Sequence, residues 1–142
     1  MNPSPDFIEV FDDALDPAFC TQLIETFEAS PHRQPGRTGG GVDTSKKLST
    51  DLYLNEHPEW RAALQQVQKV TTFKAAEYFK RYPFGLIAPI ALTLQDPDTG
   101  QPAQLTIDNF ERLGAPRAMD LMRSVYRLGH IQMQKYEQGR GN

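Results

Sequence analysis

The strongest constraint on the fold is the alternation of side chains in the stretch from His130 to Tyr136. Apolar Ile131 and Met133 alternate there with polar residues, namely His130, Gln132, Gln134 and Tyr136. Successive side chains of a β-strand point to opposite faces, so this stretch predicts a strand with one apolar and one polar face. Gly139 and Gly141 follow in a polar run, which predicts a turn after the strand.

Apolar residues recur at spacings of three and four in three other stretches, which predicts amphipathic helices. The first helix begins at Asp16 and Pro17, because aspartate caps free amides and proline suits the first helical turn. It ends by Ser30. The longest helix is predicted from Pro58 to Tyr82, and a third from Pro116 to Leu128.

Three shorter segments have the composition of extended chain. The residues from Phe7 to Phe11 are aromatic and β-branched, and they predict a first strand. Leu48 to Leu54 predicts a short extended segment. Phe84 to Gln95 is nearly all apolar, which favours a run buried on both faces with an edge, a bulge or a break at Pro89.

A hairpin and a short helix complete the predicted order of elements. Asp96 to Gly100 has turn chemistry, and the alternating residues 104–107 after it complete a hairpin. Asp108 and Glu111 form a capping-box-like start to a short helix that closes at Gly114. Together, the segments predict an α+β fold in which helices pack on a partial antiparallel sheet.

The bulk properties favour one folded domain and argue against several classes of function. The 142 residues are enough for one domain with one sizeable core. A net charge of −3 gives no general attraction to nucleic acid. The amino terminus lacks the pattern of a signal peptide, and no apolar run approaches the roughly 20 residues of a membrane span. We therefore expect a cytoplasmic protein without nucleic-acid or membrane partners. Cys20 is the only cysteine, so no internal disulfide can form.

Two loops resemble ligand-binding loops only superficially. The stretch from Pro31 to Lys47, here called the basic loop, is rich in glycine and basic residues. It lacks the order Gly-x-x-x-x-Gly-Lys-Ser/Thr of a phosphate-binding loop, so a solvated loop is the better interpretation. Asp96, Asp98 and Gly100 imitate part of a calcium loop, but the glycine comes one place early and Ile107 stands where a glutamate ligand is needed.

The strand that ends in Tyr136 and the glycine-rich turn after it resemble the lead-in to the double-stranded β-helix, or jelly roll, of iron(II)/2-oxoglutarate-dependent dioxygenases of the prolyl 4-hydroxylase-like type. The resemblance covers Gln132 to Gly141 most specifically, and the upstream stretch from Lys47 to Leu52 is also similar. In that family a His-x-Asp metal motif follows within a few residues, with a distal histidine and a basic 2-oxoglutarate anchor further on. The resemblance therefore implies that residues 1–142 are a single, incomplete dioxygenase-like domain, the amino-terminal portion of such an enzyme, with the metal motif beyond Asn142.

The resemblance also implies roles for two side chains of this strand. Tyr136 matches the family tyrosine that lines the pocket and hydrogen-bonds 2-oxoglutarate, and Gln134 shares its face. Without the resemblance, Tyr136 is equally well explained as a half-buried tyrosine of an ordinary strand. The complete enzyme would use Fe(II) and 2-oxoglutarate to hydroxylate an unactivated carbon of an unknown substrate. We expect neither cofactor to bind tightly to this chain alone.

A metal site built from residues of this chain is a competing interpretation. His57 and Glu59 have the His-x-carboxylate form, and His130 is available as the third ligand of a two-histidine, one-carboxylate site. The resembled family, however, places this motif after the strand and turn. Here it precedes them, and Glu59 at a helix start is explained by the helix dipole. We therefore assign no metal ligands.

A function of a different class is also compatible with the sequence. An exposed final strand offers its free backbone groups to a strand of another chain. The chain would then be a small stand-alone protein-interaction module without catalytic activity, and the basic loop would contribute contacts. Strand pairing at the carboxyl-terminal edge is the partner interaction expected in that case.

Overall fold

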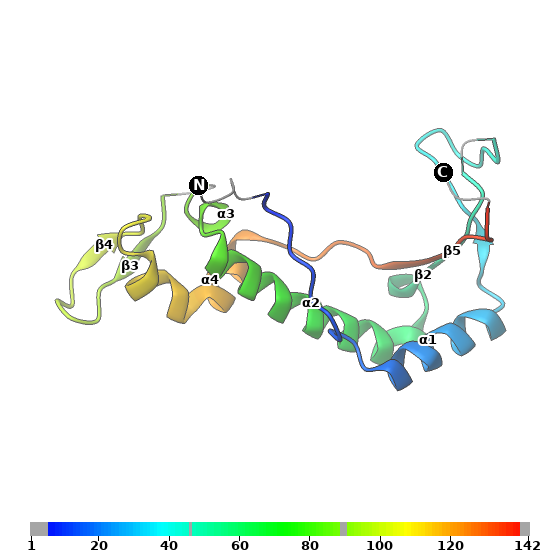
Figure 1. Cartoon of the computed structure of the whole chain (residues 1–142), viewed down its shortest axis with the longest axis horizontal. Coiled ribbons are helices and arrows are strands. Elements are labelled where there is room, and N and C mark those ends of the chain that lie inside the picture. Colours follow the sequence, from blue (N-terminus) through cyan, green and yellow to red (C-terminus); the bar gives the residue numbers. More distant parts are fainter. Residues whose placement is uncertain (1–5, 46, 89–90, 140–142) are drawn as a thin grey trace. The chain divides into compact units, whose positions relative to one another are not determined.

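The computed structural model of the chain describes residues 6–45, 47–88 and 91–139 (Figure 1). It is a mixed structure of helices and small antiparallel sheets, as the α+β prediction requires. The chain divides into two compact units. Unit 1 comprises Met1–Ala14 and Lys69–Leu128, and unit 2 comprises Leu15–Gln68 and Gly129–Asn142.

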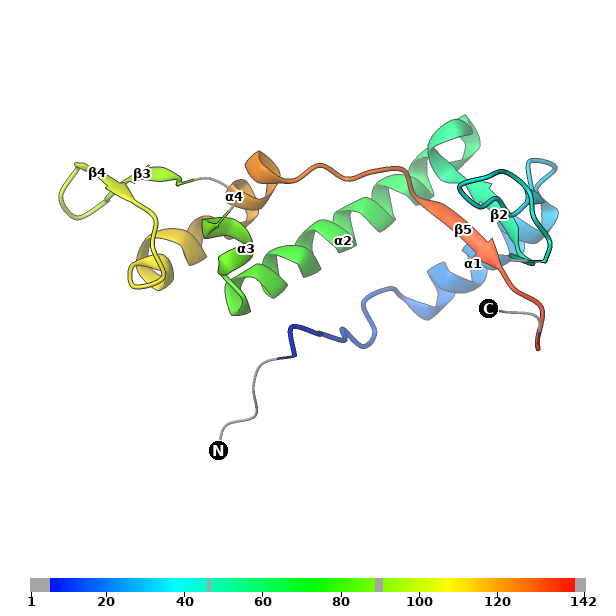
Figure 2. The same ribbon diagram turned by 90° about the horizontal axis from the view of Figure 1, so that it is seen from above.

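Unit 2 contains a three-stranded sheet and the first helix. The strands β1 (Gln34–Pro35), β2 (Thr50–Tyr53) and β5 (Gln132–Lys135) are antiparallel and lie in the order β1-β2-β5. The helix α1 (Pro17–Ala29) begins as predicted, since Asp16 Oδ1 accepts hydrogen bonds from the amides of Ala18 at 2.8 Å and Phe19 at 3.2 Å. Within this unit α1 crosses β5 at an angle and lies on one face of the strand (Figures 1 and 2).

The apolar face of the β2–β5 pair packs with α1 and the start of α2 in one hydrophobic cluster. Leu52 of β2 stands opposite Met133 of β5 in the ladder, and Ile131 and Met133 both pack against this cluster, as the alternation in the sequence predicted. The 3₁₀ turns Leu54–Glu56 and Pro58–Trp60 then lead into α2 (Arg61–Arg81), the longest helix, as predicted. The buried members of this cluster are Phe27, Leu52, Leu54 and Trp60.

Unit 1 is built around the rest of α2. It contains the one-turn helix α3 (Phe84–Ile87), the hairpin of β3 (Thr93–Gln95) and β4 (Pro102–Gln104), and α4 (Ala118–Val125). A π-helical turn at Phe110–Gly114 and a 3₁₀ turn at Ala115–Arg117 precede α4. The buried residues of its hydrophobic cluster are Ala76, Leu86, Leu105, Phe110, Leu113, Ala118, Leu121 and Met122.

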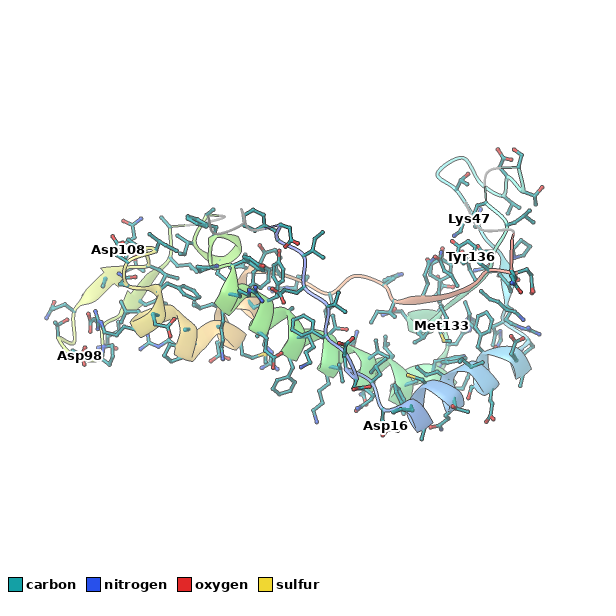
Figure 3. The ribbon with its side chains drawn as sticks, viewed as in Figure 1. Asp16, Lys47, Asp98, Asp108, Met133 and Tyr136 are labelled. Carbon is teal, nitrogen blue, oxygen red and sulfur yellow. The ribbon has the colours of Figure 1, made fainter. Side chains whose placement is uncertain are left out.

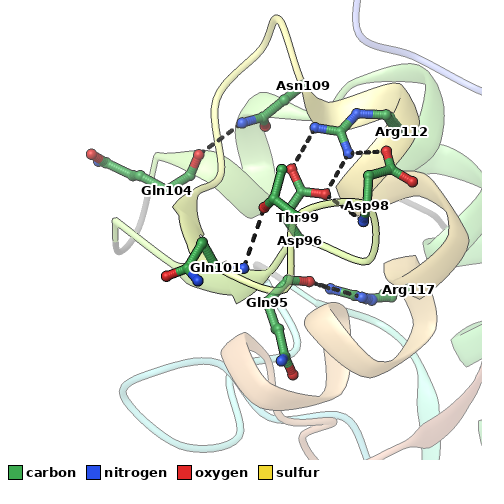
Figure 4. A network of polar contacts seen from close by, with 9 residues as sticks. All are labelled: Gln95, Asp96, Asp98, Thr99, Gln101, Gln104, Asn109, Arg112 and Arg117. Atoms are coloured by element: carbon green, nitrogen blue, oxygen red, sulfur yellow. Dashed lines mark hydrogen bonds and ion pairs between the residues drawn. The ribbon is translucent and has the colours of Figure 1, made fainter.

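A polar network fastens the β3–β4 hairpin to the π-helical turn (Figure 4). Arg112 donates to both carboxylate oxygens of the buried Asp96 at 2.8 Å, and to Asp98 Oδ2 at 2.9 Å. The pKa of Asp96 is held far below its usual range, first by the hydrogen bonds of Arg112 and then by the backbone amide of Asp98. The carboxylates of Asp96 and Asp98, which imitate part of a calcium loop in the sequence, therefore pair with the guanidinium of Arg112.

The prediction of a strand from Phe7 to Phe11 is wrong, because none of these residues belongs to a strand. Phe7 has a left-handed backbone conformation with φ of 58°. The segment is held to α2 by side chains instead. Tyr78 donates its hydroxyl hydrogen to Phe7 O at 2.8 Å, and Glu9 pairs with Arg81 at 2.7 Å. The β-propensity of these residues was not sufficient to form a strand, because side-chain contacts with α2 hold the segment in another conformation.

The prediction of a buried extended run from Phe84 to Gln95 is wrong in its first part, because Phe84–Ile87 forms the helix α3. Pro83 O accepts the first helical hydrogen bond from Leu86 N at 2.9 Å, and this turn places Leu86 in the core of unit 1. Gly85 lets the ring of Phe79 come close, since a Cβ at this position would overlap it. Only β3 remains of the predicted strand. The break predicted at Pro89 lies outside the described residues, as do Lys46 and Gly141.

Two other expectations differ from the structure in extent. Helix α4 is shorter than predicted, because it begins at Ala118 and the amide of its cap residue Tyr126 closes on Met122 O. Among the described residues, the buried apolar side chains form two hydrophobic clusters, whereas the length predicted one core. That both clusters belong to one domain stays a prediction. None of the described helices is long and apolar enough to cross a membrane.

Candidate functional site

The sheet of unit 2 carries polar side chains on the face opposite its hydrophobic cluster. Lys47, Ser49 and Asp51 follow each other at every second residue and share one side of the extended chain. Asp51 stands opposite Gln134 of β5 in the ladder. Tyr136 lies two residues after Gln134 and so continues the same side. We call these five residues the polar face.

Asp51 is the centre of the polar face and is only 1% exposed. Its Oδ1 accepts a hydrogen bond from Ser49 Oγ at 2.6 Å. Its Oδ2 accepts one from Lys47 Nζ at 2.9 Å and a longer one from Gln134 Nε2 at 3.4 Å. Burial by itself raises the pKa of Asp51, but the donors Ser49 and Lys47 outweigh it and hold the pKa below its ordinary value. The carboxylate is therefore ionised at neutral pH.

Gly36 brings the basic loop close to the polar face. Its amide donates a hydrogen bond to Ser49 O at 2.8 Å. A Cβ at Gly36 would overlap Ser49 Oγ and would lie 3.2 Å from Asp51 Oδ1. The pKa of Lys47 is raised, chiefly by its hydrogen bond to Asp51, so Lys47 is a cation here. The basic loop is therefore held against β2 by the close approach of Gly36 to Ser49 and by the ion pair of Lys47 with Asp51.

The two residues predicted to contact 2-oxoglutarate, Tyr136 and Gln134, are brought together on the polar face. Tyr136 donates its hydroxyl hydrogen to Gln134 Oε1 at 3.3 Å and is 44% exposed. Gln134 in turn donates to Asp51, so a row of hydrogen bonds runs from Tyr136 to Lys47. The turn predicted after this strand is present, with Gly139 at a positive φ of 76°. The cofactor role of both residues stays a prediction.

A pocket of about 350 Å³ lies between α1 and β5, and its lining includes Gln134 and Tyr136 of the polar face as well as Met133 and Lys135. Its charged side chains neutralise each other, because Lys135 Nζ lies 2.7 Å from Glu28 Oε1. The hydrogen bond from Lys135 lowers the pKa of Glu28. Met133, labelled in Figure 3, lines this pocket and packs against the hydrophobic cluster of unit 2. Met133 therefore packs against the cluster, while Gln134 and Tyr136 border the same pocket.

A second polar cluster in unit 2 has the ligand types of a metal site. One ligand atom each of His32, His57 and Glu59 lies within 4.8 Å of the others. His32 belongs to the basic loop, His57 caps the 3₁₀ turn, and Glu59 lies within that turn. The structure therefore brings His32, and not His130, beside His57 and Glu59. His130 is exposed and lies in irregular chain before β5.

Three residues of the polar face had a signal in the sequence, although no role in a site was assigned to them. Lys47, Ser49 and Asp51 alternate with apolar or small residues in the stretch noted for its resemblance, and this alternation predicts a shared face. His32 has no such local signal. Its approach to His57 depends on the path of the basic loop, which no spacing rule predicts.

Comparisons with protein-family models, with curated proteins and with solved structures found no match for this chain. Any function of this chain must therefore be inferred from the polar face and from the resemblance of β5 and the turn after it.

Proposed function

We propose that this chain is the amino-terminal part of an iron(II)/2-oxoglutarate-dependent oxygenase of the prolyl 4-hydroxylase-like type, in which β2 and β5 are strands of a jelly roll. In this proposal the polar face lines the cofactor pocket. The complete enzyme hydroxylates an unactivated carbon, and this chain supplies wall and scaffold. The observation that carries the proposal is the row of hydrogen bonds from Tyr136 to Lys47, on one face of a strand pair whose other face is packed.

Tyr136 is suited to hold a carboxylate. Its hydroxyl donates a hydrogen bond, and its ring excludes water from one side of a bound anion. The present hydrogen bond from Tyr136 to Gln134 is long, at 3.3 Å. A carboxylate oxygen would replace it with a shorter, charge-assisted bond. The released Gln134 side chain could then orient toward the same ligand.

The same geometry supports weak cofactor binding by this chain alone. Lys47 and Asp51 neutralise each other, so the polar face offers donors without a net positive charge for a dianion. When bound in the complete enzyme, iron(II) supplies the activation of oxygen. In our proposal its ligands and the basic 2-oxoglutarate anchor come from residues that are not part of this chain. The polar face contains no histidine to hold the metal.

Titration of the ¹⁵N-labelled chain with 2-oxoglutarate, followed by NMR, tests the role of the polar face. We expect amide shifts confined to Tyr136, Gln134 and their neighbours in β2, with a Kd on the order of 1 mM or weaker. Tyr136→Phe should remove most of these shifts, because it keeps the ring and loses the donor. The matched control Tyr126→Phe, in unit 1, should leave them unchanged.

Two results of this titration would contradict the assignment. One is a set of shifts centred outside the polar face. The other is a response that is the same in the wild-type chain and in Tyr136→Phe. Rapid, stoichiometric decarboxylation of 2-oxoglutarate by the chain itself would contradict the scaffold role.

A stand-alone protein-interaction module is the second candidate function, and one observation favours it. Among the described residues, β5 is paired on one side only, because the sheet order is β1-β2-β5. Its other edge carries backbone groups that could pair with a strand of another chain. In that case the row from Tyr136 to Lys47 only stabilises the sheet.

The state of the purified chain distinguishes the two functions. A fragment that lacks strands of its sheet should keep unit 2 folded in dilute solution but aggregate through the open edge of β5 as its concentration rises. A complete interaction module should be a monomer by size-exclusion chromatography and should melt in one cooperative transition. The second result would favour the module.

A further inference from the structure

We propose that His32, His57 and Glu59 form a binding site for one divalent transition-metal ion. This site is distinct from the polar face, since it shares no residue with Lys47, Asp51 or Tyr136. The inference is therefore independent of the oxygenase proposal. It rests on two chain segments of unit 2 that bring three ligand atoms within 4.8 Å of one another.

The distances within the cluster are close to those of a metal centre. Ligand atoms bound at about 2.1 Å to a tetrahedral ion lie roughly 3.4 Å from each other. His32 Nε2 and Glu59 Oε1 are already 3.1 Å apart. The rings of His32 and His57 are stacked, with centroids 4.1 Å apart and an interplanar angle of 14°.

Coordination by both imidazoles requires the stacked rings to turn, so that their nitrogens aim at one point. The side chains of His32 and Glu59 are 43% and 49% exposed, which leaves room for these rotations. The separation between ligand atoms, which reaches up to 4.8 Å, then has to shrink by about 1.4 Å to match the spacing around a bound tetrahedral ion. Side-chain torsions alone can supply this movement.

The backbone that carries the three ligands is anchored on both sides. The amide of His32 donates to Oγ of the buried Ser30 at 3.2 Å, which fixes the chain directly after α1. On the other side, the amide of Trp60 donates to His57 O at 3.0 Å. The Trp60 side chain is 1% exposed. Metal binding therefore orders exposed side chains on a backbone that is already held, which lowers its entropic cost.

The ligand set selects the class of metal ion. Two imidazoles and one carboxylate suit Zn²⁺, Co²⁺, Ni²⁺ and Cu²⁺, whereas Ca²⁺ and Mg²⁺ prefer shells of oxygen atoms. Three protein ligands leave at least one position for water. The expected site is thus an open, partly exposed one with moderate affinity, and not a closed structural zinc centre.

Titration of the purified chain without a polyhistidine tag tests the site with Co²⁺ and Zn²⁺ as probes. We expect one equivalent of Co²⁺ to bind and produce a visible absorption band, and Zn²⁺ to displace it. His32→Ala and Glu59→Gln should each weaken binding by roughly tenfold or more. Both residues are on the surface, and the fluorescence of Trp60 reports whether the variants remain folded.

His130→Ala is the matched control, because His130 is the one histidine of the chain outside the cluster. The proposal predicts unchanged affinity for this variant. It is overturned if His130→Ala weakens binding while His32→Ala does not, since the ion is then held elsewhere. It is equally overturned if no one-to-one complex forms, or if Mg²⁺ competes as well as Zn²⁺ does.

Discussion

Lys47 Nζ lies 2.9 Å from Oδ2 of Asp51, and this ion pair joins the basic loop to β2. The Asp51 side chain is 1% exposed and that of Lys47 is 18% exposed, so neither charge is well solvated. Each group therefore needs the other, because an unpaired charge in such a place is costly. Through Gln134 the same carboxylate also reaches β5. Stability of the sheet and any function of the polar face should both depend on this pair.

Replacement of Asp51 should destabilise unit 2. Asp51→Ala leaves the donors of Ser49 and Lys47 without their acceptor, and we expect a loss of about 2 kcal/mol in the free energy of unfolding. Urea unfolding followed by Trp60 fluorescence measures it, since Trp60 is buried in the same unit. The control Glu25→Ala, at an exposed position of α1 in unit 2, should change stability by less than about 0.5 kcal/mol. Equal stability of the two variants would contradict the central role of Asp51.

The pH dependence of stability should carry the signature of Asp51. Its pKa in the folded chain is lowered, so its contribution is fully present above the pKa of about 3.9 of an unfolded aspartate. The contribution is lost as the pH falls through the lowered pKa. The unfolding temperature of the wild-type chain should thus drop more steeply below about pH 4 than that of Asp51→Asn. Parallel curves for both proteins would argue against a paired carboxylate.

Gly36 should tolerate no side chain. A methyl group in Gly36→Ala would overlap Ser49 Oγ, and we expect overpacking to cost about 1–3 kcal/mol in the free energy of unfolding. Gly39→Ala is the matched control in the same loop, because a Cβ there meets nothing within 4 Å. Urea unfolding of the two variants compares them directly. The close approach of the basic loop to β2 would be disproved by equal effects.

Arg112 should control the stability of the β3–β4 hairpin. Its guanidinium binds both oxygens of Asp96 in a fork that lysine cannot reproduce. In Arg112→Lys we expect the hairpin amides to exchange with solvent roughly three to ten times faster, as local opening becomes easier. Hydrogen exchange measured by NMR provides the test. Arg123→Lys, which changes an exposed arginine of α4, should leave hairpin exchange as it is.

Elements with local signals could be predicted from the sequence. The cap formed by Asp16, the helical spacing of α2 and the alternation in β5 each lie within one continuous segment. The turn from Asp96 to Gly100 likewise predicted the β3–β4 hairpin, although its second strand is Pro102–Gln104 and not the predicted residues 104–107. Each element could therefore be recognised without knowledge of its neighbours.

Features that depend on distant residues could not be predicted in this way. Phe7 to Phe11 has the composition of a strand, but Tyr78 and Arg81 of α2 hold it in another conformation. The approach of His32 to His57 likewise depends on the course of the loop between α1 and β2. On the polar face, the alternation of Tyr136 and Gln134 predicted their shared side, whereas the contact of Gln134 with Asp51 depends on the register of β2 and β5.

The most direct test of the proposed function is the sequence of the native transcript past the codon for Asn142. The oxygenase proposal predicts that the reading frame continues into a His-x-Asp motif within a few codons, with a further histidine and a basic residue downstream. A stop codon directly after Asn142 would contradict it. The polar face would then be a structural network, and the interaction module would be the better account of this chain.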